Sequence, residues 1–205
     1  MTRISVVYAA LGAMALAGCA TPPYAGPVEV TRFVAPTAGS QLGRGTVFVE
    51  SGPGMEGDSL ALAPYKAVVA QELARLGYRE AAREGADQIA QLRLERYALG
   101  RDGARRGPVS VGVGGSTGSY GSGVGLGIGI NLGGGGNRER LVTEMGVMLR
   151  DKTSGATYWE GRAQFSVSPN SSFADSTANA TAIAGALFRD FPGNNGETVE
   201  VRVAE

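Results

Sequence analysis

The sequence predicts an α+β fold, a two-layer sandwich in which a mainly antiparallel sheet carries two helices on one face. Several segments alternate between apolar and polar residues, so that each would have one apolar and one polar face. This alternation is typical of antiparallel strands that are covered on one side only. Two further segments have apolar residues three and four positions apart, which is the spacing of an amphipathic helix.

The predicted strands are bounded by glycine, proline, serine and aspartate, the residues that commonly form turns. They cover residues 28–34, 46–49, 88–99, 140–150, 158–167 and 198–203. In the strand over 158–167, Trp159 and Phe165 fall on the apolar face, whereas Glu160 and Arg162 fall on the polar face. We therefore expect Trp159 in the core and the two charged residues in solvent.

Proline and glycine mark the ends of both predicted helices. The first helix begins near Pro64 and ends before Gly77. Proline suits the first turn, where its missing N–H is not needed, and glycine suits the position after the last turn. The second helix runs from about Ser176 to Phe191 and is followed by Pro192, which cannot continue it.

The N-terminal segment has the layout of a secretory signal peptide. Arg3 supplies a positive start, residues 4–17 carry no charge, and small residues precede Cys19, the single cysteine of the chain. The apolar run is shorter than the roughly 20 residues that a membrane-spanning helix needs. Leu16-Ala17-Gly18-Cys19 resembles the lipobox of bacterial lipoproteins. The alternative is an ordinary cleaved signal peptide, or a short membrane anchor, with an incidental cysteine.

The lipobox resemblance implies that residues 1–18 are removed and that Cys19 is acylated on its thiol and on its new amino group. Several acyl chains hold a protein stably at a membrane, whereas one chain holds it weakly. Ala20 stands where an aspartate would imply the inner membrane, so the resemblance implies the outer membrane, with the protein facing the periplasm. Residues 19–27 would be a linker and residues 28–205 a single domain.

The composition argues against several classes of function. The chain has 19 basic and 19 acidic residues, so its net charge offers no attraction for nucleic acid or for an anionic lipid surface. It has no histidine, which is the commonest general base and transition-metal ligand. The sequence therefore predicts no catalytic residue, no metal site and no cofactor.

A glycine-rich insertion from Gly107 to Gly136 contains no charged residue. Within it, apolar residues alternate with glycines, so an extended form would be a hairpin with one apolar face. The apolar residues that form this candidate interaction surface are Val124, Leu126, Ile128 and Ile130. Interior glycine destabilises a strand by about 0.5–1 kcal/mol relative to alanine, which favours a disordered or half-ordered loop instead. No lysine or serine follows the glycines as a phosphate-binding loop requires, so a nucleotide site is not predicted.

Asp87 and Asp151 lie at predicted strand ends, where catalytic carboxylates are often found. Aspartate is also common in turns, where its side chain accepts backbone hydrogen bonds, and this structural role is the one we expect for both. Other charged residues lie on the predicted strands, and their simplest interpretation is a solvated sheet face on which opposite charges pair across strands. They are Arg93, Glu95, Glu144, Arg150, Glu160 and Arg162.

Several motifs in chain order resemble domain-of-unknown-function family 4136, a family of bacterial envelope lipoproteins. After the lipobox they are Leu76-Gly77-Tyr78 at a helix end, Ala86-Asp87 at a strand start, the glycine-rich insertion, Asp151 with Trp159-Glu160-Gly161, and Phe191-Pro192 after the last helix. The resemblance covers roughly residues 28–192. It implies an envelope lipoprotein and no particular activity.

These observations predict a non-enzymatic binding or structural module of the cell envelope, held at the membrane by acyl chains and contacting another envelope protein. One alternative is a membrane-active or self-assembling protein, in which the glycine-rich hairpins of neighbouring chains pair into a homo-oligomer. A second alternative is an envelope hydrolase that uses carboxylates alone.

Overall fold

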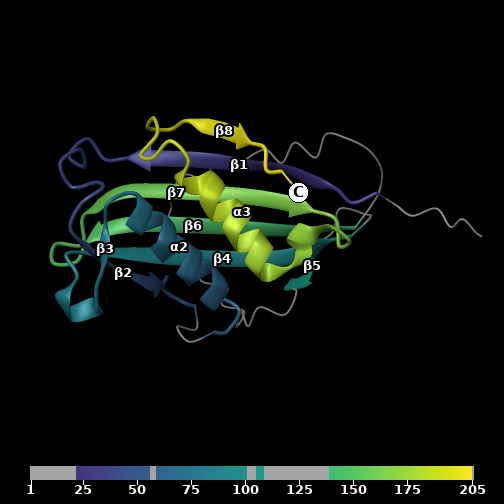
Figure 1. The fold of residues 1–205 in the computed structure, drawn as a ribbon, viewed down its shortest axis with the longest axis horizontal. Coiled ribbons are helices and arrows are strands. Elements are labelled where there is room, and N and C mark those ends of the chain that lie inside the picture. The colour runs from purple at the N-terminus through teal and green to yellow at the C-terminus, as the bar shows by residue number, and fades with distance from the viewer. Residues whose placement is uncertain (1–21, 56–58, 101–104, 109–138, 205) are drawn as a thin grey trace, which may run out of the picture.

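The computed structural model describes residues 22–55, 59–100, 105–108 and 139–204. They form an eight-stranded sheet with two helices packed on one face, which confirms the predicted two-layer α+β sandwich (Figure 1). Long strands run side by side across the molecule, and both helices lie in front of them in this view. Among the described residues, no helix is long and apolar enough to span a membrane.

The strands follow the predicted positions closely, with two short additional ones. Their bounds are β1 Ala25–Val34, β2 Thr46–Ser51, β3 Arg79–Glu80, β4 Gln88–Leu99, β5 Arg105–Pro108, β6 Arg140–Asp151, β7 Thr157–Val167 and β8 Thr198–Val201. Along the sheet the order is β3-β2-β4-β6-β7-β1-β8, and β5 pairs with β4. The central pairs β4–β6 and β6–β7 are antiparallel, whereas β2 lies parallel to both β3 and β4.

Helix α2, Ala63–Arg75, connects the parallel strands β2 and β3, and the chain then continues into β4. The helix has Pro64 in its first turn and ends before Gly77, both as predicted. Gly77 has a φ of +101°, and a Cβ there would lie 2.6 Å from the carbonyl oxygen of Gly43. Only glycine therefore fits this helix end. Two short 3-10 turns, η2 Arg83–Gly85 and η3 Ser172–Ala174, precede β4 and the second helix.

Helix α3, Ser176–Phe188, begins after Asp175, whose carboxylate accepts hydrogen bonds from two backbone N–H groups of the first turn. The helix ends earlier than the predicted Phe191. Asp190 has a positive φ of 56°, and the buried guanidinium of Arg32 binds carbonyl groups of the last turn. Arg32 on β1 thus ends the helix before Pro192 does. The local sequence of the helix could not indicate this.

The core lies between the sheet and the helices, and the predicted inward faces of the strands form it. Trp159 has no exposed surface and stacks on Phe188 of α3, with ring centroids 5.5 Å apart. Gly161, the next inward residue on β7, leaves room for this indole, since a Cβ there would lie 2.2 Å from the Trp159 ring. On the opposite face, Glu160 and Arg162 form an ion pair. The predicted faces of this strand are confirmed.

One expectation about the sheet is wrong, because its second face is not open everywhere. A small apolar cluster of Tyr97, Leu99 and Val142 is buried on the face opposite the helices, near the end of β4. Tyr97 and Leu99 have the same outward parity as Glu95. Alternation identifies the face on which a side chain lies, but not whether distant parts of the chain cover that face.

Two predicted boundaries are also wrong by a few residues. β1 begins at Ala25, so the last residues of the predicted linker over 19–27 belong to the sheet. Pro27 lies where the register of β1 against β7 shifts, and proline is tolerated at such an irregularity. The insertion was predicted to begin at Gly107, but Arg105–Pro108 pairs with β4 as β5. The rest of the predicted insertion lies outside the described residues.

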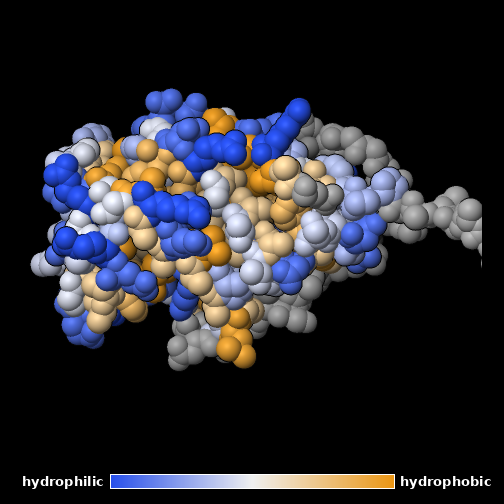
Figure 2. Space-filling view, in the orientation of Figure 1, coloured by the Kyte–Doolittle hydropathy of each residue, from blue (hydrophilic) through white to orange (hydrophobic). Residues whose placement is uncertain are grey.

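Figure 2 shows the helix side of the molecule. Hydrophilic residues cover much of it, and hydrophobic residues lie between them in small separate areas. Among the described residues, Leu60 is the large hydrophobic side chain that is strongly exposed, at 89%. Single exposed residues of this kind are normal on protein surfaces, so the described residues on this face offer no candidate binding patch.

Candidate functional site

The residues that the sequence predicts to be functional lie outside the described part of the chain. They are Cys19 for acylation, and Val124, Leu126, Ile128 and Ile130 for interaction. The structure does describe the places where the segments that carry them join the domain. These junctions lie at one end of the sheet, which we call the tether end.

The strand registers define the tether end. Ala25 of β1 and Leu141 of β6 both pair with Val167 of β7. Leu99, the last residue of β4, pairs with Arg140, the first residue of β6. The chain therefore enters the domain, leaves it for the glycine-rich segment and returns from that segment at the same end of the sheet, on the right in Figure 1.

Tyr24 connects the entering chain to the returning one. Its backbone N–H donates to Ser168 Oγ at 2.9 Å, and its carbonyl accepts from the N–H of Ser168 at 2.8 Å. The guanidinium of Arg140 lies over its ring, with Cζ 4.8 Å from the ring centroid. Such a cation–π contact contributes about 0.5–1 kcal/mol at an exposed site. The two junctions are thus in direct contact.

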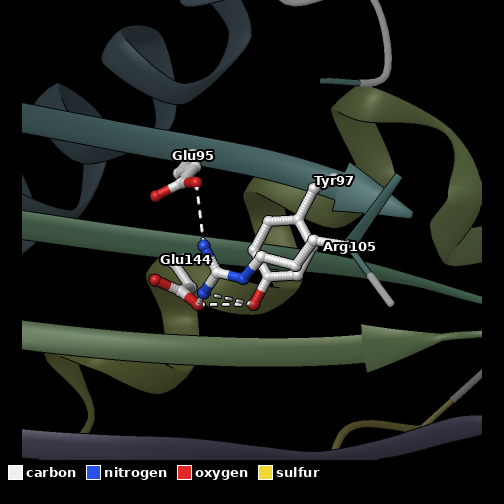
Figure 3. Close-up of polar contacts among 4 residues, drawn as sticks. All are labelled: Glu95, Tyr97, Arg105 and Glu144. Carbon is white, nitrogen blue, oxygen red and sulfur yellow. Dashed lines mark hydrogen bonds and ion pairs between the residues drawn. The ribbon is translucent and has the colours of Figure 1, made fainter. Parts of the chain in front are cut away.

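A polar network lies where the chain leaves β4 for the glycine-rich segment (Figure 3). Arg105 of β5 donates to Glu95 Oε1 at 3.2 Å, to Tyr97 Oη at 3.1 Å and to Glu144 Oε1 at 3.3 Å. Its Cζ also lies 4.1 Å from the centroid of the Tyr97 ring. The Tyr97 hydroxyl donates to Glu144 Oε1 at 2.6 Å. One cation from β5 therefore contacts side chains of both β4 and β6.

This network compensates an unfavourable pairing in the sheet. Glu95 and Glu144 lie directly opposite each other on neighbouring strands, and like charges in this position destabilise a sheet. Arg105 bridges the two carboxylates and offsets their repulsion. Because the carboxylates repel each other when Arg105 is absent, they favour the position in which β5 pairs with β4. Exposed ion pairs of this kind contribute at most about 1 kcal/mol each, so the network mainly positions the chain.

The chemistry of Tyr97 also fits a structural contact. Burial raises the pKa of its hydroxyl well above the ordinary value, and the hydrogen bond to Glu144 together with the charge of that carboxylate raises it further. Tyr97 therefore stays protonated at neutral pH and acts as a hydrogen-bond donor. A tyrosine that served as a general base would need the opposite shift.

Asp87 and Asp151 have the hydrogen bonds of turn residues. Asp87 accepts from the backbone N–H of Thr46 at 2.9 Å and from its hydroxyl at 2.7 Å, and Asp151 accepts from the N–H of Ser154 at 2.7 Å. These hydrogen bonds lower the pKa of both carboxyl groups. Both are ionised at neutral pH, which does not suit a general acid. Among the described residues, no group of three or more His, Cys, Asp or Glu could hold a metal ion.

The predicted pairing of opposite charges across strands is wrong in detail. Glu95 and Glu144 face each other, while Glu160 pairs with Arg162 of its own strand at 2.7 Å. Sequence reasoning missed Arg105, because its partners depend on β5 folding back on β4. The one available signal was Tyr97, an aromatic residue on an outward face otherwise assigned to charged residues.

No family model matches the chain, and no match was found among curated proteins. Similar solved structures include a PelC dodecamer from Paraburkholderia phytofirmans, 14% identical over 78% of this chain and 94% of that chain, with a TM-score of 0.45. A variant PelC dodecamer from the same organism is 13% identical over 78% and 93%, with a TM-score of 0.44. A PDZ domain protein from Parabacteroides distasonis is 10% identical over 87% of this chain and 38% of that chain, with a TM-score of 0.49. We draw nothing on function from similarities this distant.

Proposed function

We propose that this chain is a lipid-anchored module of the cell envelope, located at the outer membrane and facing the periplasm, that binds another envelope protein and performs no catalysis. The lipobox-like Leu16-Ala17-Gly18-Cys19 and the motifs that resemble domain-of-unknown-function family 4136 support the envelope location. The observation that carries the binding role is the tether end, where the N-terminal segment and the glycine-rich segment join the domain side by side.

A short tether would bring this end close to the membrane. Only residues 20–23 separate Cys19 from Tyr24, and an extended chain covers at most about 3.3–3.6 Å per residue. An acylated Cys19 would therefore hold Tyr24 within roughly 17 Å of the membrane surface. The glycine-rich segment leaves the domain at this end, so an apolar surface on it would be presented next to the membrane. The partner that fits best is an envelope protein embedded in that membrane.

Contacts at both junctions favour a binding role for the segment over that of a passive loop. Arg105 is held by Glu95 and Glu144 where the chain leaves, and Arg140 lies on Tyr24 where it returns. Fixed ends reduce the conformational freedom that a segment loses on binding, and so reduce the free-energy cost of binding. The binding surface in this proposal is the apolar set Val124, Leu126, Ile128 and Ile130.

The anchor is tested by replacing Cys19 with serine. Because no thiol remains to be acylated, we expect the variant to be absent from the outer-membrane fraction, either soluble or uncleaved. Cell fractionation and the mass of the N-terminal peptide measure this. Thr21→Ser, which leaves the thiol in place, is the matched control and should fractionate like the parent. A Cys19→Ser protein that still partitions with outer membranes like the parent would show that the anchor is not an acylated cysteine.

The binding role is tested by crosslinking in intact cells. The double variant Leu126→Asp with Ile128→Asp places two charges on the apolar surface and keeps the chain length. We expect it to fold like the parent, because the core that the described residues form is unchanged, and to lose the main crosslinked protein. Thr117→Asp with Ser119→Asp adds the same charge to the same segment at positions of the opposite parity and should keep the crosslink. Unchanged crosslinks in the first variant would contradict the proposal, and crosslinks only between copies would favour the self-assembling alternative.

A further inference from the structure

β8 is the last strand on one side of the sheet, at the top of Figure 1, and its outer edge pairs with no strand of the described chain. The opposite side of the sheet is divided among short strands: β3 has only two residues and covers only the start of β2, and β5 on β4 has four residues and ends in proline. Exposed edges are commonly protected by proline or lysine, and β8 contains neither. Of the two edges, β8 is therefore the one suited to pairing with another chain.

A glycine bulge determines which backbone groups of β8 face outward. The N–H of Gly196 donates to the carbonyl of Arg32 at 2.8 Å, and the N–H of Arg32 donates to the carbonyl of Glu197 at 3.2 Å. Gly196 has a φ of +77°, as the first residue of such a bulge requires. The bulge makes Arg32 a hydrogen-bonded partner of β8. From there, hydrogen-bonded and non-hydrogen-bonded residue pairs alternate along the two antiparallel strands.

Along β8 this alternation directs the backbone N–H and C=O groups of Val199 and Val201 toward β1, where their register partners are Val30 and Val28. The backbone N–H and C=O groups of Thr198 and Glu200 consequently point away from the sheet. β8 ends at Val201, and if the strand continued by one residue the same alternation would direct the backbone groups of Arg202 outward as well.

The side chains along this edge have an uncompensated charge. Glu29 of β1 and Glu200 of β8 lie directly opposite each other in a non-hydrogen-bonded pair, where side chains approach most closely. Burial raises the pKa of Glu29, and the charge of Glu200 raises it further. Within the described part of the chain, no cation pairs with Glu200 or Glu29. A cation placed beside Glu200 by a partner would relieve this repulsion.

We propose that β8 pairs antiparallel with β8 of a second copy of this chain, in a register centred on Val201. In that register Val199-Glu200-Val201-Arg202-Val203 is complementary to itself. Glu200 of each copy lies opposite Arg202 of the other, and Val199 lies opposite Val203. Glu200 and Arg202 would form the hydrogen-bonded pairs, which matches the outward direction of their backbone groups. The same patch contacts itself across a two-fold axis, as in most homodimers.

Neighbouring registers are less favourable. A register centred on Glu200 places two Glu200 side chains opposite each other, where like charges destabilise the pair. A register shifted by one residue pairs Glu200 and Arg202 each with a valine. It would also require one of the two sheets to present its opposite face, because side-chain direction alternates at every residue. The contact is short, so we expect a weak, concentration-dependent dimer. This inference rests on neither the acylated anchor nor the glycine-rich segment.

The test is charge reversal, measured by sedimentation velocity of the full chain in detergent over a concentration series. Glu200→Lys and Arg202→Glu each turn both ion pairs of the interface into like-charge pairs, so each variant should weaken dimerisation at least about tenfold. An equimolar mixture of the two variants restores both ion pairs, as does the double variant that carries both changes. Both should dimerise close to the parent level.

Controls separate the interface from folding. Both positions are exposed, and Glu200→Lys also removes the repulsion with Glu29, so thermal midpoints should stay at or above the parent value. Glu80→Lys makes the same charge change on β3 at the other edge and should leave dimerisation unchanged. A parent that stays monomeric at every concentration, single variants that dimerise like the parent, or a mixture that does not recover would each overturn the proposal.

Discussion

Replacing Trp159 with alanine should lower the free energy of unfolding by about 3–5 kcal/mol, the usual effect of truncating a large buried aromatic residue. Trp159 has no exposed surface, and its ring lies 5.5 Å from that of Phe188 and 5.2 Å from that of Phe191. Its indole N–H donates to the carbonyl of Pro192 at 2.9 Å. The substitution would therefore open a cavity and also release the loop after α3 from the sheet.

Chemical denaturation followed by far-ultraviolet circular dichroism measures this effect, because Trp159 is the only tryptophan and its removal abolishes the intrinsic tryptophan signal. Glu160→Ala is the matched control on the next residue of β7. It changes the polar face and breaks an ion pair with an exposed arginine, so its effect should stay within about 0.5 kcal/mol. Equal midpoints for the two variants would mean that the faces of β7 are assigned incorrectly.

Replacing Arg32 with alanine should lower the free energy of unfolding by about 2–5 kcal/mol. Only 2% of this residue is exposed, and its guanidinium donates to the carbonyl oxygens of Leu187 at 3.1 Å, Ala186 at 3.3 Å and Arg189 at 2.6 Å. These groups lie at the C-terminal end of α3, where a cation is also favoured by the helix dipole. The variant would leave several buried acceptors without a donor.

Trp159 fluorescence provides the readout for Arg32 variants, since the indole contacts the same end of α3. Arg32→Lys keeps the positive charge but has a single ammonium group in place of the planar fork. It cannot reach all three carbonyls in the same geometry, so we expect a stability between those of parent and alanine variant. An Arg32→Ala protein as stable as the parent would exclude a structural role for this arginine at the end of α3.

Local pattern was sufficient to predict most of the fold. The strand faces around Trp159, the helix start at Pro64 and the helix end at Gly77 were all identified correctly. Each depends on interactions within a few residues, such as a backbone conformation or the alternation that burial on one face imposes. The end of α3 was placed too late because it depends on Arg32, which is 155 positions away from Leu187 in the chain.

The candidate site was much less predictable than the fold. Sequence patterns directed attention to Cys19 and the glycine-rich segment, and these stay predictions. The contacts that place both segments at one end of the sheet were not foreseen, namely Arg140 on Tyr24 and Arg105 between Glu95 and Glu144. The signs of these charges are visible in the sequence, but their partners are set by strand register.

The sequence by itself determined which face of each strand and helix is apolar, and therefore that two helices must cover one side of a sheet. It also determined the chemical classes that the composition disfavours, since the chain has no histidine and a single cysteine. Only the tertiary structure decided what lies opposite each side chain: the carbonyls that Arg32 binds, the acids that Arg105 bridges and the glutamates that meet at the β8 edge. The physical reason is that periodicity records burial, which is a property of one residue, whereas hydrogen bonds and ion pairs need two residues brought together by register.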